Sequence, residues 1–270
     1  MALSSPDQRG GSGDPMVLIH GVAGAWRAWH ELAPRLADRF DVLAVALAGH
    51  EDAADLPAGV PLTVASMADA VERDMDAAGF GSAHLVGNSL GGWLALELAK
   101  RGRARTVVAL SPAGGWTAGS REEQRIVRSI RMGHALNRWA APRARSMMRR
   151  PVWKKLMYSQ AMAHPERLEP EVAAGAIRAF ASARIPEFME NVAGHGGVRD
   201  LDQVSCPVLV AWAEKDRVLP RKAYAAPFDQ GLPHAERNLM PDVGHVAMWD
   251  DPALVADLVL DFVGKQAARV

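Results

Sequence analysis

Short apolar runs alternate with segments of helical periodicity along most of the chain. The apolar runs predict buried strands at residues 16–19, 41–47, 83–87, 106–110, 207–212 and 238–240. Helical spacing predicts helices at residues 26–37, 64–79, 90–100 and 252–266. Pro34 should bend the first of these helices or mark an early turn. Strands that are apolar throughout, and that alternate with helices, are typical of a mostly parallel α/β sheet with helices on both faces.

The alternation stops between residues 113 and 198, where helical patterns follow one another without a clear strand. Gly-rich stretches, Ala113–Gly115 and Gly194–Gly197, mark both ends of this segment, as expected at a flexible boundary. We therefore expect an inserted all-helical cap, called the helical insertion below. It would divide a core of residues 16–112 and 199–270, preceded by a flexible leader over residues 1–15.

Composition narrows the class of protein. The chain has 270 residues, 49% of them hydrophobic and 23% charged, which fits one large globular domain or two small ones. Lys+Arg and Asp+Glu both number 31, so the net charge of the whole chain offers no case for attraction to nucleic acid or to a membrane. Cys206 is the one cysteine, which excludes an internal disulfide. The first 15 residues lack signal-peptide architecture, and no apolar stretch reaches the roughly 18 residues of a membrane span, so we expect a cytoplasmic protein.

Charge is unevenly distributed within this neutral total. Residues 121–155 contain eleven Lys or Arg and two acids. Arg121, Arg125 and Arg128 have helical i, i+4, i+7 spacing, with apolar residues at other positions, as in a solvated helix face. This interpretation is favoured; the alternative is that the basic stripe attracts an anionic substrate to the mouth of a binding site.

The sharpest chemical signal is the sequence Gly87-Asn88-Ser89-Leu90-Gly91, a G-x-S-x-G between a predicted strand and a predicted helix. A turn this tight leaves no room for side chains two residues before and two after the serine, which explains the glycines. The turn holds Ser89 at the N-terminus of the helix, where backbone N–H groups and the helix dipole stabilise an oxyanion. Ser89 is therefore the candidate nucleophile.

A serine nucleophile needs a base that is oriented by a third group. His245 follows the last short strand and precedes the final helix, so its loop should emerge at the same sheet edge as Ser89. Asp216 lies just beyond the strand at 207–212 and is the candidate acid. Asp242 competes for this role, but an acid three residues before the histidine would not easily point at the imidazole.

Ser89, Asp216 and His245, in that order, together with His20-Gly21 after the first strand, resemble the α/β-hydrolase superfamily with a helical cap. The resemblance runs from about residue 16 to the end of the chain. It implies that the backbone N–H groups of Val22 and Leu90 bind the oxyanion and that no cofactor is needed. It also implies two further antiparallel strands at the start, for which only fifteen residues are available, so one or both should be missing.

The resemblance implies a serine hydrolase that acts through an acyl-enzyme on a small or medium carboxylic ester, thioester or lactone. Asn88, Trp116 and Val246 are candidate residues of the substrate pocket. Relatives that cleave carbon–carbon bonds share GNSxGG, but a tryptophan commonly follows their catalytic histidine, where this chain has Val246. Epoxide hydrolases and haloalkane dehalogenases place an aspartate at the nucleophile, so we expect Ser89 to exclude both.

Two alternatives remain open. One is a carbon–carbon bond hydrolase or a cofactor-independent oxygen-using enzyme on the same fold. The other is a ligand-binding protein with a low-turnover triad. No metal-ligand spacing, Walker loop or G-x-G-x-x-G motif occurs, and the sequence gives no oligomeric state.

Overall fold

The computed structural model describes residues 8–268, which contain a seven-stranded sheet. Its strands lie in the order β1-β3-β2-β4-β5-β6-β7, and every neighbouring pair is parallel except β1 and β3. The mostly parallel α/β sheet predicted from the apolar runs is confirmed. The strands are β1 Arg9–Gly10, β2 Asp14–Ile19, β3 Phe40–Val45, β4 Ala83–Asn88, β5 Ala104–Leu110, β6 Val208–Ala213 and β7 Glu236–Met240.

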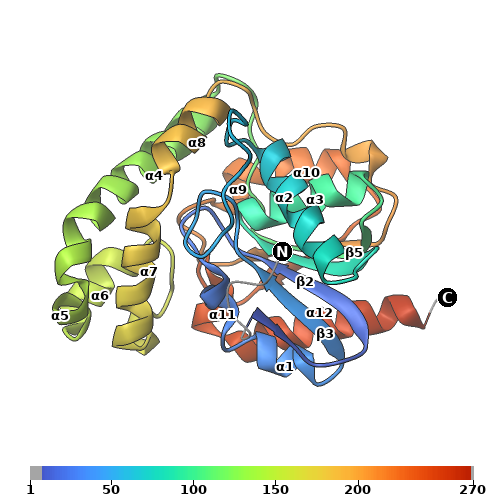
Figure 1. Ribbon diagram of the computed structural model, residues 1–270, viewed down its shortest axis with the longest axis horizontal. Helices are drawn as coiled ribbons and strands as arrows, with labels where there is room; N and C mark the ends of the chain where they lie inside the picture. The colour runs from blue at the N-terminus through green and yellow to red at the C-terminus, as the bar shows by residue number, and fades with distance from the viewer. Residues whose placement is uncertain (1–7, 269–270) are drawn as a thin grey trace.

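Helices connect these strands and cover the sheet (Figure 1). The segment predicted as one helix over residues 26–37 is two short pieces, because Pro34 lies in the first turn of a new helix. The helices outside the insertion are η2 Trp26–Trp29, α1 Ala33–Ala37, α2 Val64–Ala77, α3 Leu90–Lys100, η5 Leu201–Gln203, α9 Arg221–Tyr224, α10 Ala226–Gly231, α11 Ala247–Asp250 and α12 Pro252–Ala267.

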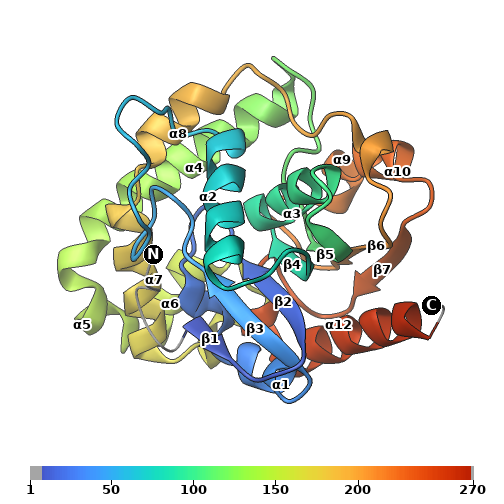
Figure 2. The same ribbon diagram turned by 45° about the vertical axis from the view of Figure 1, so that its right-hand side comes forward.

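Both faces of the sheet are buried, which is why the strands are apolar throughout. Along β2, Val17 and Ile19 pack into a core shared with α2 and α3, whereas Met16 and Leu18 pack into a core shared with α1 and α12. Figure 2 shows α2 and α3 on one side of the strands and α1 and α12 on the other. This sandwich fixes the carboxyl ends of β2, β4, β6 and β7, after which the candidate residues lie.

The N-terminal region differs from the expected flexible leader over residues 1–15. Arg9 and Gly10 pair antiparallel with Leu43 and Val42, and β2 already begins at Asp14. The Arg9 guanidinium anchors this segment through hydrogen bonds to the Asp41 carboxylate of 2.9 and 2.5 Å. One short antiparallel strand is therefore present where the resemblance implied two. Residues 1–7 lie outside the described residues.

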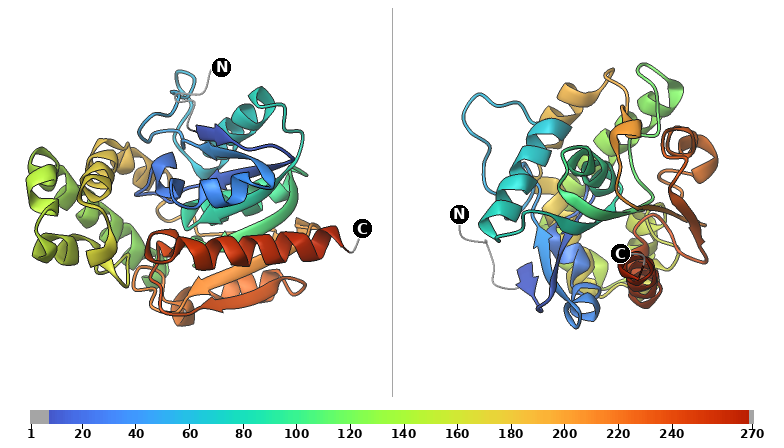
Figure 3. Two further views of the ribbon diagram at one scale, coloured as in Figure 1. Left: turned by 90° about the horizontal axis from the view of Figure 1, so that it is seen from below. Right: turned by 90° about the vertical axis from the view of Figure 1, so that its right-hand side faces the viewer.

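The helical insertion lies between β5 and β6 and protrudes to one side of the sheet (Figures 1 and 3). It has its own apolar cluster, which includes Met148, Tyr158, Ala173 and Ile177. Its helices are α4 Arg121–Ala140, η3 Ala141–Arg143, α5 Ala144–Met148, α6 Pro151–Tyr158, η4 Pro165–Arg167, α7 Pro170–Ser182 and α8 Ile185–Val192.

The two ends of the insertion are held side by side. Gly197 and Val198 donate backbone hydrogen bonds to the carbonyl oxygens of Trp116 and Gly114. A Cβ at Gly197 would lie 1.7 Å from the Gly114 carbonyl oxygen, so glycine is required there by close approach. The Gly-rich junctions thus pair tightly, and flexibility does not account for Gly197.

No helix within residues 8–268 is long and apolar enough to cross a membrane.

Candidate active site

Ser89 occupies a strained turn between β4 and α3. Its φ is +57°, a left-handed value that is uncommon for a residue with a side chain. A Cβ at Gly87 would lie 2.1 Å from the Gly91 carbonyl oxygen, and one at Gly91 would lie 1.9 Å from the Ile19 carbonyl oxygen. The steric reason predicted for the two glycines is therefore confirmed.

His245 and Asp216 lie within hydrogen-bonding distance. His245 Nδ1 is 2.7 Å from Asp216 Oδ2, and both side chains are buried. The other carboxylate oxygen of Asp216 accepts backbone hydrogen bonds from Val218 and Leu219 at 2.9 and 2.7 Å, which fix the carboxylate. Because Nδ1 is engaged with Asp216, Nε2 is the imidazole nitrogen left for other contacts. His245 and Ser89 line the same cavity.

Asp242, the competing acid, lies elsewhere. Its carboxylate is largely exposed and contacts Lys215 and His164. Hydrogen bonds from these two groups lower the pKa of Asp242. The geometry thus pairs His245 with Asp216 and leaves Asp242 at the surface.

The two predicted oxyanion donors lie beside Ser89. Leu90 is the first residue of α3, so its N–H has no acceptor within the helix. In the described part of the chain the N–H of Val22 has no acceptor either.

His50 Nε2 lies 2.7 Å from the Val22 carbonyl oxygen and so holds the Val22–Ala23 peptide, which follows the one that carries the Val22 N–H. Burial lowers the pKa of His50 from its ordinary value near 6.5, so the imidazole is neutral at pH 7. Nε2 lies closer to the Val22 carbonyl oxygen than Nδ1 lies to that of Ala48, 2.7 against 3.2 Å, so we assign the proton to Nε2.

The loop that carries His245 is held from three directions. The amide of Asn88 donates to the His245 carbonyl oxygen at 2.8 Å, and Val246 donates its N–H to the Ala161 carbonyl oxygen at 2.9 Å. The N–H of Gly244 donates to the buried Asp250 carboxylate at 2.7 Å. Sequence reasoning missed Asp250, whose one signal was an acid five residues after the candidate histidine. Asn88, predicted to line the pocket, also positions this loop.

The cavity at Ser89 has a volume of about 240 Å³. The predicted pocket residues Asn88, Trp116 and Val246 all line it, together with Val22 and Leu90. Most of its other walls are apolar side chains of the helical insertion and of α3. Residues 8–268 contain no group of three or more His, Cys, Asp or Glu arranged to hold a metal ion.

Comparison with known proteins now identifies the family. The sequence profile of the alpha/beta hydrolase family matches residues 16–258. The chain belongs to the alpha/beta hydrolase family. This hydrolase is 32% identical, over 77% of its chain and 99% of the relative, to epoxide hydrolase EphH of Mycobacterium tuberculosis.

Two further similarities span nearly the whole hydrolase. It is 28% identical over 90% of its length to the dihydrolipoyllysine-residue acetyltransferase component of an acetoin-cleaving system from Cupriavidus necator, of which it spans 62%. Its fold superposes on a thermophilic esterase of Thermogutta terrifontis with a TM-score of 0.72, at 23% identity, covering 95% of this chain and 92% of the esterase.

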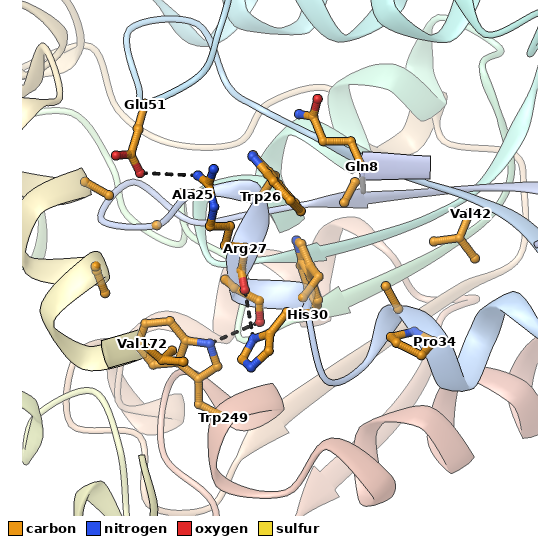
Figure 4. A pocket seen from close by; sticks show the side chains of 18 of the residues that line it. Gln8, Ala25, Trp26, Arg27, His30, Pro34, Val42, Glu51, Val172 and Trp249 are labelled. Atoms are coloured by element: carbon orange, nitrogen blue, oxygen red, sulfur yellow. Dashed lines mark hydrogen bonds and ion pairs between the residues drawn. The ribbon is translucent and has the colours of Figure 1, made fainter. Parts of the chain in front are cut away.

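A second and larger cavity of about 820 Å³ lies next to the first (Figure 4). Trp26, Arg27 and His30 form one wall, and Val172 of α7 lies on the other side. Both cavities are lined by Gly24, Ala28, Ala176 and Trp249. The indole of Trp249 donates to the Ala28 carbonyl oxygen at 3.0 Å, so this hydrogen bond lies at the boundary between the two.

The basic stripe of the helical insertion does not reach the cavity at Ser89. Arg121, Arg125 and Arg128 of α4 are exposed, and none of them lines the space at Ser89. Ile126, Val127 and Ile130 of the same helix do line it. This arrangement agrees with the interpretation of the stripe as a solvated helix face.

Proposed function

We propose that this hydrolase is a serine ester hydrolase that acts through an acyl-enzyme at Ser89. The observation that carries the proposal is the buried contact between His245 and Asp216, which orients the imidazole at the cavity that Ser89 lines. A serine at the tip of a strained turn, a histidine and a histidine-orienting carboxylate are the groups that nucleophilic acyl transfer needs.

Each group has a role in the proposed reaction. His245 removes the proton from the Ser89 hydroxyl as it attacks the carbonyl carbon, and then returns that proton to the leaving alcohol. Asp216 holds the imidazole orientation and stabilises the imidazolium. The N–H groups of Val22 and Leu90 bind the developing oxyanion. Water, activated by His245, then releases the acid and regenerates Ser89.

The size and lining of the cavity at Ser89 favour a substrate with a small or medium apolar acyl group. A volume of about 240 Å³ is below the roughly 300–1,000 Å³ of sites for drug-sized ligands. Ile126, Phe180, Phe188, Met189 and Val192 of the helical insertion contribute apolar side chains to its walls. We propose that the insertion, over residues 113–198, is the cap that encloses this acyl group. A carboxylic ester, thioester or lactone fits this description.

Epoxide hydrolysis is the second candidate, because the 32% identical relative carries that name. Covalent attack by Ser89 on an epoxide carbon would leave an ether, which has no carbonyl carbon for water to attack, so the enzyme would not turn over by that route. Epoxide opening on this chain would instead need direct attack by a water that His245 activates. An ester reaction uses every group in the site and is preferred.

The test compares wild type and Ser89→Ala on a series of p-nitrophenyl esters and on styrene oxide. We expect ester hydrolysis by wild type and a loss of roughly 10⁴- to 10⁶-fold in kcat in the folded variant. Equal ester hydrolysis by both proteins would contradict the proposal. Styrene oxide opening that persists in Ser89→Ala would support the epoxide candidate instead.

A further inference from the structure

The outer surface of the helical insertion exposes large hydrophobic side chains. Residues 8–268 contain seven exposed large hydrophobic residues, and five of them belong to α4 and α6. Their exposed fractions range from 43% to 68%. We call these five residues the insertion patch: Met132, Leu136, Trp139, Val152 and Leu156.

The patch forms stripes along two helices that meet. Met132, Leu136 and Trp139 follow i, i+4, i+7 spacing on α4, and Val152 and Leu156 follow i, i+4 spacing on α6. The rings of Trp139 and Trp153 lie 6.5 Å apart between centroids and join the two helices. Figure 1 shows α4 and α6 on the side of the molecule away from the sheet. Grouped exposed hydrophobic residues of this kind mark an interaction surface.

Unpaired positive charge is concentrated in the chain segment that carries the patch. Residues 121–155 hold eleven Lys or Arg and two acids, whereas the rest of the chain holds twenty Lys or Arg and twenty-nine acids. In the described residues, Arg145 is the only one of the eleven that forms an ion pair, with Glu171. Lys154 is buried and donates to the Glu166 and Leu168 carbonyl oxygens. The other nine lack an acidic partner within the described chain.

We propose that the insertion patch docks on an anionic lipid surface. Helices that carry tryptophan and leucine among Lys and Arg side chains lie at the boundary between lipid headgroups and acyl chains. The apolar side chains would enter that boundary, and unpaired cations of α4 and α6 beside them, such as Arg131, Arg138 and Lys155, would face the lipid phosphates. A symmetric contact with a second copy would place the same positive charges against each other, so charge complementarity favours the lipid.

Docking in this orientation would bring the lipid surface to the outer side of the wall of the catalytic cavity. On α4, Ile130, Gly133 and Asn137 line the space at Ser89, while Met132 and Leu136 point outward. On α6, Met157 lines the cavity beside the exposed Leu156. The same two helices thus form both the lipid-facing surface and a wall of the site.

The test measures binding of the full chain to sedimented vesicles. Vesicles of phosphatidylcholine alone are compared with vesicles of equal parts phosphatidylcholine and phosphatidylglycerol. We expect binding to the anionic vesicles that weakens from about 0.1 to 1 M salt, as the Debye length falls from about 10 to 3 Å. Equal binding to both vesicle types, or binding to neither, would overturn the proposal.

Two pairs of variants separate the apolar and charged contributions. Leu136→Ser with Trp139→Ser, and separately Arg131→Gln with Arg138→Gln, should each weaken binding to the anionic vesicles by at least about tenfold. Matched controls change exposed residues elsewhere: Leu239→Ser, and Arg221→Gln with Lys222→Gln, should bind like wild type. Unchanged binding by both patch variants would overturn the proposal. So would a dimer in solution that Leu136→Ser with Trp139→Ser converts to a monomer.

Discussion

The Asp250 carboxylate accepts a 2.7 Å hydrogen bond from the backbone N–H of Gly244, the residue before His245. The same carboxylate accepts backbone hydrogen bonds from Ala163 and His164 of the helical insertion, each 2.8 Å long. A Cβ at Gly244 would lie 2.8 Å from the Ala163 nitrogen, so the two segments are in direct contact. One buried acid therefore ties the insertion to the loop that carries the candidate base.

Asp250→Asn should displace the loop that carries His245, although Asp250 does not contact the imidazole itself. An amide in this position turns an N–H₂ group toward backbone donors and leaves at least one of them unsatisfied, at a cost of about 1–3 kcal/mol. We expect a lower melting temperature and about a tenfold lower kcat for ester hydrolysis, with KM little changed. Asp251→Asn is the matched control, because Asp251 caps α12 and an asparagine can accept the same bond from Leu254. Equal activity in both variants would disprove this role for Asp250.

Asp216→Asn and Asp242→Asn discriminate between the two carboxylates. Asp216 contacts the imidazole, so its amide should favour the wrong histidine tautomer and lower kcat by roughly 10⁴-fold. Asp242 contacts Lys215 and His164 at the surface, and its substitution should change kcat less than about twofold. Steady-state ester hydrolysis by both purified variants provides the measurement. A larger loss in Asp242→Asn would mean that the acid is assigned incorrectly.

The 820 Å³ cavity should accommodate the distal end of longer esters, since it shares four lining residues with the space at Ser89. Gly175 of α7 lines only this larger cavity, and a Cβ there would meet nothing closer than an Arg178 nitrogen at 3.9 Å. Gly175→Leu should therefore fill part of the cavity. We expect at least about a fivefold higher KM for a p-nitrophenyl laurate but an unchanged KM for the acetate.

Gly175→Ala serves as the control for the longer esters. It removes the same glycine from α7 and adds only one methyl group to the cavity. It should behave like wild type with both esters. Identical KM values for all three proteins with the laurate would show that the chain does not enter this cavity.

Buried histidines should make the fold sensitive to acid. Burial lowers the pKa of His20 to about 3, and also lowers the pKa values of His50 and His84. Between the unfolded value near 6.5 and the lower folded values, the unfolded chain binds more protons than the folded one. The free energy of unfolding should thus be complete above about pH 6.5 and decrease as the pH falls below it.

Urea unfolding at a series of pH values measures this effect. In His20→Gln the slope of unfolding free energy against pH should decrease by up to about 1.4 kcal/mol per pH unit between about pH 6 and pH 4. The substitution can also change the free energy of unfolding at every pH. The test therefore uses only the slope against pH, which reports how many protons the chain takes up on unfolding. His30→Gln, which removes an exposed histidine, is the matched substitution against which the slope of His20→Gln is compared. A wild-type slope in His20→Gln would contradict the explanation.

The strands and the serine turn were predictable because local chemistry determines them. Each predicted strand is a run of apolar residues that only a sheet covered on both faces can bury. The observed strands β2 to β7 match these runs to within two residues at either end, whereas β1 was not predicted. The glycines around Ser89 follow from sterics within five residues. It was also predictable that Ser89, Asp216 and His245 lie at one edge of the sheet, since the carboxyl ends of parallel strands share that edge.

Contacts between distant segments were not predictable from spacing. Arg9 holds a strand to the sheet through Asp41, and nothing in the Gly-rich sequence around Arg9 signals that partner. Gly197 looked like a hinge residue but permits a close approach to Gly114. Asp250 lies in a polar pair, Asp250-Asp251, which reads as a helix start, and its role depends on a loop 87 residues away. Each of these depends on tertiary packing that no local pattern encodes.

Detection of the acyl-enzyme itself tests most directly whether the reaction passes through a covalent intermediate at Ser89. The protein is mixed with p-nitrophenyl butyrate, quenched in acid within one turnover and analysed by mass spectrometry of the intact chain and its peptides. If Ser89 is the nucleophile, a butyryl adduct forms on the peptide that contains Ser89, with a burst of p-nitrophenol, and it is absent from Ser89→Ala. Hydrolysis with no adduct, or with an adduct only on a peptide that lacks Ser89, would contradict a covalent intermediate at Ser89.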